Sequence, residues 1–244
     1  MTQITKKIAL ITGANKGIGY EVARQLASSG CLVLLGARNR TLGEQAAAKL
    51  AAENLDVRYI SIDLDDSAAI AAAARSIDAD FGRLDILVNN AGIAVQGDGP
   101  PSTSSLEAIE RDYRVNFIGT VAVTQAILPL LRKAPAARIV NVSSGLGSLM
   151  KTGDPAFQFV AYKYLGYAAS KAALNVLTVQ LAYELRDTAI KVNSADPGYT
   201  ATDLDEHRGT QTVAEGAIEI VRLALLLHDG PTGAFSNKNG KVPW

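Results

Sequence analysis

Four polar side chains in this sequence are of the types that perform acid–base chemistry on an oxygen atom. Tyr167 and Lys171 stand four residues apart in the run Tyr-Ala-Ala-Ser-Lys, and Asn116 and Ser144 precede them. Side chains at this spacing share one face of a helix. A neighbouring ammonium stabilises phenolate and lowers the pKa of tyrosine, which is about 10 in the free side chain. The set therefore predicts a proton-transfer site, with Ser144 donating a hydrogen bond to a carbonyl oxygen.

A glycine-rich turn near the start of the chain predicts a dinucleotide site. Residues 12–19 read Thr-Gly-Ala-Asn-Lys-Gly-Ile-Gly, between a strand-like run and a helix-like run. Gly17 and Gly19 lack a Cβ, so a pyrophosphate can approach the backbone, and the N–H groups of the helix favour its charge. A plain strand-to-helix turn would also explain the glycines. Together with the acid–base residues, the turn indicates an enzyme that transfers a hydride to or from a nicotinamide cofactor.

The elements that must position these residues alternate between strands and helices. Strands are expected at residues 8–11, 31–35, 57–62, 84–88, 138–142, 190–195 and 233–238. Helices are expected at about 18–29, 41–52, 67–81, 106–131, 167–185 and 212–227. The strands are continuous apolar runs, which is typical of a parallel sheet covered by helices on both faces. This predicts one α/β domain over residues 1–244, a doubly wound Rossmann fold of about seven strands with its site at their carboxyl ends.

Composition excludes several classes of function. The 24 basic and 24 acidic residues give a net charge of zero, which argues against binding of nucleic acid or of a membrane surface. The single cysteine, Cys31, cannot form an intramolecular disulfide, and with only His207 and His228 no metal site is expected. No apolar run approaches the length of a signal peptide core or a membrane span, so a cytoplasmic protein is expected.

Over nearly its whole length the chain resembles the short-chain dehydrogenase/reductase family. Residues 12–19 match its signature T-G-x-x-x-G-[IL]-G, and further family motifs match at residues 63–64, 89–92, 115–117, 141–144, 167–171 and 197–202. The resemblance implies a catalytic set of Asn116, Ser144, Tyr167 and Lys171. It implies cofactor contacts from Gly13, Asn15, Lys16, Gly17, Ile18, Gly19, Arg38, Asp63, Leu64, Asn90, Ala91, Gly92, Tyr167, Lys171, Pro197, Gly198 and Thr202.

The residues after the second strand predict which nicotinamide cofactor binds. An acidic residue there would accept hydrogen bonds from the ribose and repel a 2′-phosphate, but the sequence has Arg38. Arg38 and Lys16 are both suited to charge-assisted hydrogen bonds with a phosphate. Family members that prefer NADP are similar at both positions, so NADP(H) is expected. The alternative is that both residues are solvated surface charges.

The distance from Ser144 to Tyr167 departs from the usual family pattern. The step is 23 residues, where ordinary members have about a dozen. Such an insertion resembles the carbonyl reductase branch, and this resemblance implies a monomer. The added residues 146–166 include several apolar and aromatic side chains, namely Leu149, Met150, Phe157, Phe159, Val160, Tyr162 and Tyr164. They either line a pocket for an apolar carbonyl substrate or form the packing core of a lid.

We therefore expect an NADPH-dependent reductase of aldehydes, ketones or quinones. One alternative is an NADPH-binding regulatory protein without significant turnover, although the serine, tyrosine and lysine are all intact. Another is an epimerase or dehydratase of the extended branch, whose usual glycine motif and longer C-terminal part are missing. The loop at residues 97–101 is expected to be flexible, and its residues receive no role.

Overall fold

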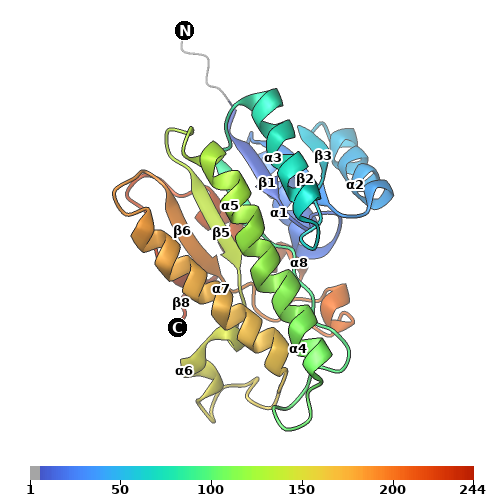
Figure 1. Ribbon diagram of the computed structural model, residues 1–244, viewed down its shortest axis with the longest axis vertical. Coiled ribbons are helices and arrows are strands. Elements are labelled where there is room, and N and C mark those ends of the chain that lie inside the picture. Colours follow the sequence, from blue (N-terminus) through green and yellow to red (C-terminus); the bar gives the residue numbers. More distant parts are fainter. Residues whose placement is uncertain (1–5) are drawn as a thin grey trace.

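Eight strands form one sheet in the computed structural model, which describes residues 6–244. They are β1 (Ile8–Ile11), β2 (Leu32–Ala37), β3 (Val57–Ser61), β4 (Ile86–Asn89), β5 (Arg138–Val142), β6 (Lys191–Ala195), β7 (Phe235–Asn237) and β8 (Gly240–Lys241). Their order is β3-β2-β1-β4-β5-β6-β7-β8, and all neighbours are parallel except β7 and β8 (Figure 1). The predicted doubly wound parallel sheet is confirmed. The additional strand β8 is only two residues long, too short to leave an apolar pattern.

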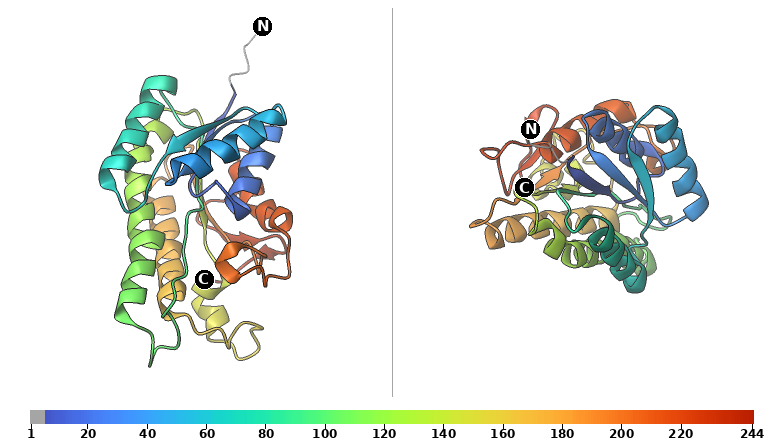
Figure 2. Two further views of the ribbon diagram at one scale, coloured as in Figure 1. Left: turned by 90° about the vertical axis from the view of Figure 1, so that its right-hand side faces the viewer. Right: turned by 90° about the horizontal axis from the view of Figure 1, so that it is seen from above.

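Helices cover both faces of the sheet, as Figure 2 shows. One layer contains α1 (Gly17–Ser28), α2 (Arg40–Ala52) and α8 (Val213–Ala224). The other contains α3 (Ser67–Phe81), α5 (Thr120–Leu131) and α7 (Leu165–Glu184). The predicted bounds of these helices lie within three residues of the observed ones, except that α5 was predicted as part of a longer helix. Because the sheet is covered twice, both sets of alternating strand side chains are buried, which explains the continuous apolar runs.

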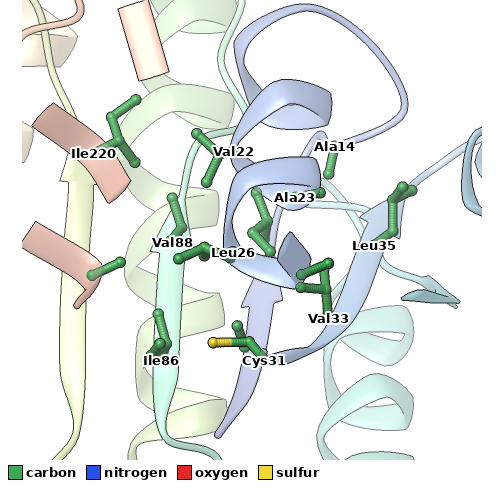
Figure 3. Close-up of a cluster of buried hydrophobic side chains, with 14 of the residues drawn as sticks. Ala14, Val22, Ala23, Leu26, Cys31, Val33, Leu35, Ile86, Val88 and Ile220 are labelled. Carbon is green, nitrogen blue, oxygen red and sulfur yellow. The ribbon is translucent and has the colours of Figure 1, made fainter. Parts of the chain in front are cut away.

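Two hydrophobic cores hold the layers to the sheet. In the first, Val22 and Leu26 of α1 pack with Leu35 of β2 and Ile220 of α8, and all four are fully buried (Figure 3). The second lies on the opposite face, where Ile127 of α5 is one of the fully buried residues. These cores fix the helices relative to the strand ends, where the polar motifs lie.

The helix predicted over residues 106–131 is interrupted in the structure. It consists of α4 (Leu106–Tyr113), a π-helical turn η1 (Arg114–Gly119) and α5. Asn116 lies inside the π turn, a distortion that is frequent at functional sites. The whole run is long and apolar enough to cross a membrane by length and composition. In the structure, however, it packs against α3 and α7 as one layer of the fold.

We call residues 145–164 the substrate-side segment. It begins with a short 3-10 turn η2 (Gly145–Gly147) and the single-turn helix α6 (Leu149–Thr152), then runs through turns to α7. Figure 1 shows α6 at one end of the molecule, below the carboxyl ends of the strands. A main-chain hydrogen bond from Met150 N to Trp244 O, 3.1 Å long, joins the segment to the C-terminal residue. A second one, from Leu165 N to Gly99 O at 3.0 Å, joins the start of α7 to the loop after β4.

Candidate active site

The turns after β1 and β4 form a shared structure that we call the cradle, residues 12–19 and 89–92. The side-chain amide of Asn90 donates to the carbonyl oxygens of Thr12, at 2.9 Å, and Gly13, at 3.2 Å. In return, the Thr12 hydroxyl accepts from the backbone N–H groups of Asn90 and Ala91, both at 3.0 Å. Asn90 and Ala91 therefore hold the two turns together.

The three glycines of the cradle have different roles. Gly13 has φ +64°, and a Cβ there would lie 2.9 Å from Cα of Ala91. A Cβ on Gly19 would lie 2.4 Å from Nδ2 of Asn90 and 2.7 Å from the Gly13 oxygen. Gly17, with φ +58°, has only the Thr202 side chain nearby, at 3.7 Å. Gly13 and Gly19 are thus required by the packing of the protein itself, whereas Gly17 leaves open space.

The first turn of α1 fits a pyrophosphate group. Its N-cap residue Lys16 is extended, makes no side-chain cap, and no acidic residue occupies the first turn. The leading N–H groups of a helix have no acceptor within the helix. Together with the helix dipole, they form a favourable anion site. Asn15 precedes the N-cap residue and Ile18 lies in the first turn of the helix, and both are partly buried.

The two cations predicted to contact a phosphate are both exposed. Arg38 directly follows β2 and has no ion-pair partner among residues 6–244. Lys16 does have one: its Nζ lies 2.6 Å from Oδ2 of Asp203, in the short turn η3 (Asp203–Asp205). Lys16 therefore joins the cradle to the loop after β6 instead of standing as an isolated surface charge.

The other predicted cofactor residues occupy the same edge of the sheet. Pro197 and Gly198, with φ +74°, begin the loop after β6, and Thr202 of this loop faces Gly17. After β3, the Asp63 carboxylate accepts from the backbone N–H of Asp65 at 3.1 Å, and Leu64 packs closely against Gly119 of η1.

Asn116 is fully buried and locked by three hydrogen bonds. Its amide exchanges two bonds with the backbone of Ile93, both 2.8 Å long, and donates a third to Oγ of Ser170 at 3.0 Å. The side chain therefore fastens the loop after β4 to α7. The π turn delivers it to this position, because it shifts the helix register at Asn116.

Lys171 and Asn116 both lie close to Gly92. A Cβ on Gly92 would lie 3.2 Å from Nζ of Lys171 and 3.4 Å from Oδ1 of Asn116. The ammonium donates to the carbonyl oxygen of Val142 at 2.8 Å and lies 5.6 Å from the centre of the Tyr167 ring. Burial lowers the pKa of Lys171 to about 8, because the charged form loses its hydration.

Tyr167 differs electrostatically from the sequence-based expectation. Burial raises the pKa of its phenol to about 12, although a side-chain hydrogen bond with Ser144 acts in the opposite direction. The expected lowering by Lys171 does not prevail, because the ammonium bonds to the Val142 carbonyl and faces the ring. The phenol is therefore protonated at neutral pH.

The structure separates Ser144 from its neighbour Ser143. Ser143 is buried and donates to the backbone oxygen of Lys171 at 3.4 Å. Ser144 is only partly buried, and its Oγ accepts from the N–H of Leu146 at 3.2 Å. The Ser144 hydroxyl also forms the hydrogen bond with the Tyr167 phenol, so the two side chains lie together.

A cavity of about 470 Å³ lies between the substrate-side segment and the loop after β4. Its lining residues are Asp98, Gly99, Pro100, Ala161, Tyr162, Lys163 and Tyr164. Phe159 packs edge-on against Phe157 and Tyr162, with ring centres 5.6 Å apart, and against Tyr199 at 5.3 Å. The aromatic residues thus pack on one another and also reach the cavity through Tyr162, whereas Leu149 and Met150 are exposed.

Asp98 is a residue whose role the sequence analysis missed. Its Oδ1 accepts from the backbone N–H of Gly166 and its Oδ2 from that of Tyr167, each at 2.9 Å. The available signal was indirect: α7 begins after Tyr164, which provides no side-chain cap. A helix without a local cap needs a partner from elsewhere in the chain.

Comparisons with known proteins identify the family. The family described as short chain dehydrogenase matches residues 7–212. A short-chain dehydrogenase of Penicillium roqueforti, anuI, is 38% identical over 230 residues, covering 92% of this chain and 90% of its own. Carbonyl reductase [NADPH] 3 of Mus musculus is 34% identical over 260 residues, covering 91% and 92%.

A solved structure has the same fold over almost the whole chain. The NADPH-bound carbonyl reductase from chicken fatty liver superposes with a TM-score of 0.85 and 29% identity, covering 99% of this chain and 96% of its own. Both this likeness and the sequence matches include the strands, helices and turns that form the site. The chain therefore belongs to the short-chain dehydrogenase/reductase family of oxidoreductases, similar to its carbonyl reductase branch.

Proposed function

We propose that this protein reduces aldehydes, ketones or quinones to alcohols with NADPH. The observation that carries the proposal is that Asn116 and Lys171 both lie close to Gly92. The same site contains the protonated Tyr167 and the uncapped N-terminus of α1. The NADPH named for the mouse and chicken relatives supports the choice of cofactor.

The cradle and the loops beside it would hold the cofactor. The N–H groups at the start of α1 suit the pyrophosphate, and Arg38 and Lys16 suit a 2′-phosphate. When bound, NADPH supplies the hydride that reduces the carbonyl carbon. The remaining contacts are proposed for Gly13, Asn15, Gly17, Ile18, Gly19, Asp63, Leu64, Asn90, Ala91, Gly92, Tyr167, Lys171, Pro197, Gly198 and Thr202.

Tyr167 would donate a proton to the carbonyl oxygen as negative charge develops there. An alkoxide is a much stronger base than a phenolate, so a phenol with a pKa of about 12 is still an effective donor. The same pKa makes phenolate scarce at neutral pH, which favours reduction over oxidation. The Ser144 hydroxyl, which is hydrogen-bonded to the Tyr167 phenol, would turn to the same oxygen and stabilise its charge.

Lys171 and Asn116 would support this proton transfer. With its pKa lowered to about 8, Lys171 can release a proton near neutral pH and replace the one that the phenol gives up. Asn116 positions the loop after β4 against α7, and so keeps Gly92 and Lys171 in contact.

Four further features are part of the proposal. The aromatic cluster around Phe159 supports an apolar substrate. All described strands lie in one sheet, which supports a single domain over residues 1–244. The monomeric state and the cytoplasmic location remain predictions.

The decrease of NADPH absorbance tests the proposal directly. The protein would be assayed with aromatic aldehydes, quinones and cyclic ketones, with NADH in parallel reactions. Turnover with NADPH and much less with NADH is the expected result. Tight NADPH binding without turnover of any carbonyl would contradict the proposal and favour a regulatory protein.

A further inference from the structure

The loop after β4 is anchored to α7 through one carboxylate. Besides the N–H groups of Gly166 and Tyr167, Asp98 accepts from Oγ of Ser104 at 2.8 Å and from its neighbour Gly99 N at 2.9 Å. Three of these four donors bond to Oδ1 and one to Oδ2. Asp98 therefore caps α7 from a position 69 residues before Tyr167 in the chain.

A second carboxyl group, that of Asp112, is buried beside this cap. Asp112 lies on α4 and is wholly inaccessible to solvent, and within residues 6–244 neither of its carboxyl oxygens accepts a hydrogen bond. The α4 and α7 backbones cross closely here: a Cβ on Gly166 would lie 2.9 Å from Cα of Ile109 and 3.2 Å from Oδ2 of Asp112.

Two adjacent carboxyl groups cannot both be ionised without a large cost where water is excluded, and here Asp112 is fully buried and Asp98 partly buried. The oxygens of Asp98 already accept hydrogen bonds from four donors. Asp112 takes the proton: burial and, after it, the charge of Asp98 raise its pKa to about 7, against a smaller opposing effect of the Val95 backbone N–H. The titratable groups that face it are Asp98 from the loop and, from α7, Lys171 and Tyr167. The charge of Lys171 lowers the pKa of Asp112, and the charge of Asp112 raises the pKa of the Tyr167 phenol.

We propose that Asp98 and Asp112 share one proton where α4 crosses α7, and that this pair positions the first turn of α7 and with it the Tyr167 phenol. The proton bonds the free side of the Asp98 carboxylate and relieves the repulsion between the two groups. Both are positioning residues, and their effect on turnover rests on the proposed reductase function.

The first test uses Asp98→Asn, which keeps the size of the side chain but removes one acceptor. The amides of Gly166 and Tyr167 should exchange with solvent at least tenfold faster. If the phenol moves by about 1 Å, kcat should fall by up to about 10²-fold. NADPH affinity should stay within about twofold, because the cradle is not touched.

Asp66→Asn provides the matched control. Asp66 caps α3 in the same manner, accepting from the N–H groups of Ala68 and Ala69 at 2.8 and 3.1 Å, but α3 carries none of the proposed site residues. This variant should unfold at a lower temperature with unchanged kcat. An equal loss of kcat in both variants would show that Asp98 contributes only general stability, and would overturn the proposal.

The second test uses Asp112→Asn, whose neutral amide replaces the protonated acid. The folded pKa of about 7 exceeds that of an ordinary aspartate, so the stabilisation by the proton is present at low pH and is lost as pH rises through 7. Relative to the wild type, the variant should therefore become more thermostable from pH 5 to pH 8.5. A difference that does not change with pH would contradict proton sharing.

These readouts separate the two proposals. Amide exchange and thermal unfolding need no substrate, so they test the carboxyl pair even if the wild type reduces no carbonyl. Conversely, if the wild type reduces carbonyls but amide exchange is unchanged in Asp98→Asn, the reductase function is supported and the proposed role of the Asp98–Asp112 pair is contradicted.

Discussion

The cradle and the substrate-side segment are held in place in different ways. The cradle is fixed by hydrogen bonds of Thr12 and Asn90 with the backbone, and by Gly13 and Gly19, where an added Cβ would clash with neighbouring atoms. The substrate-side segment is held by aromatic contacts around Phe159, and among residues 6–244 its main-chain hydrogen bonds are local turns apart from the one between Met150 and Trp244. It leaves Leu149 and Met150 exposed. Small changes should therefore disrupt the cradle, whereas changes in the segment should alter which substrate binds.

The largest effect is expected at Tyr167, which lies between the two regions. Tyr167→Phe removes the donated proton but keeps the ring, so turnover should fall by about 10²–10⁴-fold. NADPH affinity, measured by fluorescence titration, should be nearly unchanged because the cradle is intact. Retained turnover would exclude Tyr167 as the acid.

The rigidity of the cradle is tested by Gly19→Ala. The added Cβ would meet Nδ2 of Asn90 at 2.4 Å and the oxygen of Gly13 at 2.7 Å, so the free energy of unfolding should fall by about 1–3 kcal/mol. The control is Gly99→Ala in the loop beside the cavity, where a Cβ meets nothing within 4 Å. Chemical denaturation should leave this control close to the wild type. Equal losses in both variants would remove the contrast between the regions.

Cofactor choice is tested at the edge of the cradle. Arg38→Asp should lower the ratio of kcat/KM for NADPH to that for NADH by about 10- to 100-fold, because a charge-assisted bond becomes a repulsion. Arg40→Asp makes the same charge change two residues away, where the side chain pairs with Glu44 at 2.8 Å. An unchanged ratio in Arg38→Asp, or an equal change in both variants, would place the phosphate site elsewhere.

The pH dependence of turnover should identify Lys171. Its lowered pKa means that the charged form is lost above pH about 8, so kcat should decrease there, whereas Tyr167 keeps its proton to about pH 12. The decrease should persist in Asp112→Asn and move to lower pH, because the charge of Asp112 raises the pKa of Lys171. A profile that stays flat until pH 11 would assign the dependence to Tyr167 alone.

The smallest effect is expected in the substrate-side segment. Phe159→Ala removes three aromatic contacts, and KM for an aromatic carbonyl should rise by about 2- to 10-fold with little change in kcat. Tyr183→Ala, an exposed aromatic on α7, should change neither value. A lower unfolding temperature with unchanged KM would show that Phe159 is part of a packing core and not of the pocket.

Sequence patterns predicted the fold well where apolar strands alternate with helices. They failed for the helix at 106–131, because the π turn at Asn116 has no pattern of its own and is stabilised by contacts with Ile93 and Ser170. They also predicted a flexible loop at the edge of the site at residues 97–101 and assigned no role to Asp98, which makes four hydrogen bonds in the structure. A glycine- and proline-rich composition does not reveal a distant carboxylate cap.

The sequence by itself determined the family, the sheet and the cradle, because these depend on local features: glycines, apolar runs, and polar residues directly after strands. Only the tertiary structure decided the electrostatics of the site. The spacing of Tyr167 and Lys171 suggested a lowered phenol pKa, but burial produces a raised one. The tertiary structure also revealed the Asp98–Asp112 pair. The closeness of these two side chains and the exclusion of water around Asp112 result from the packing of α4 against α7, which no spacing in the chain encodes.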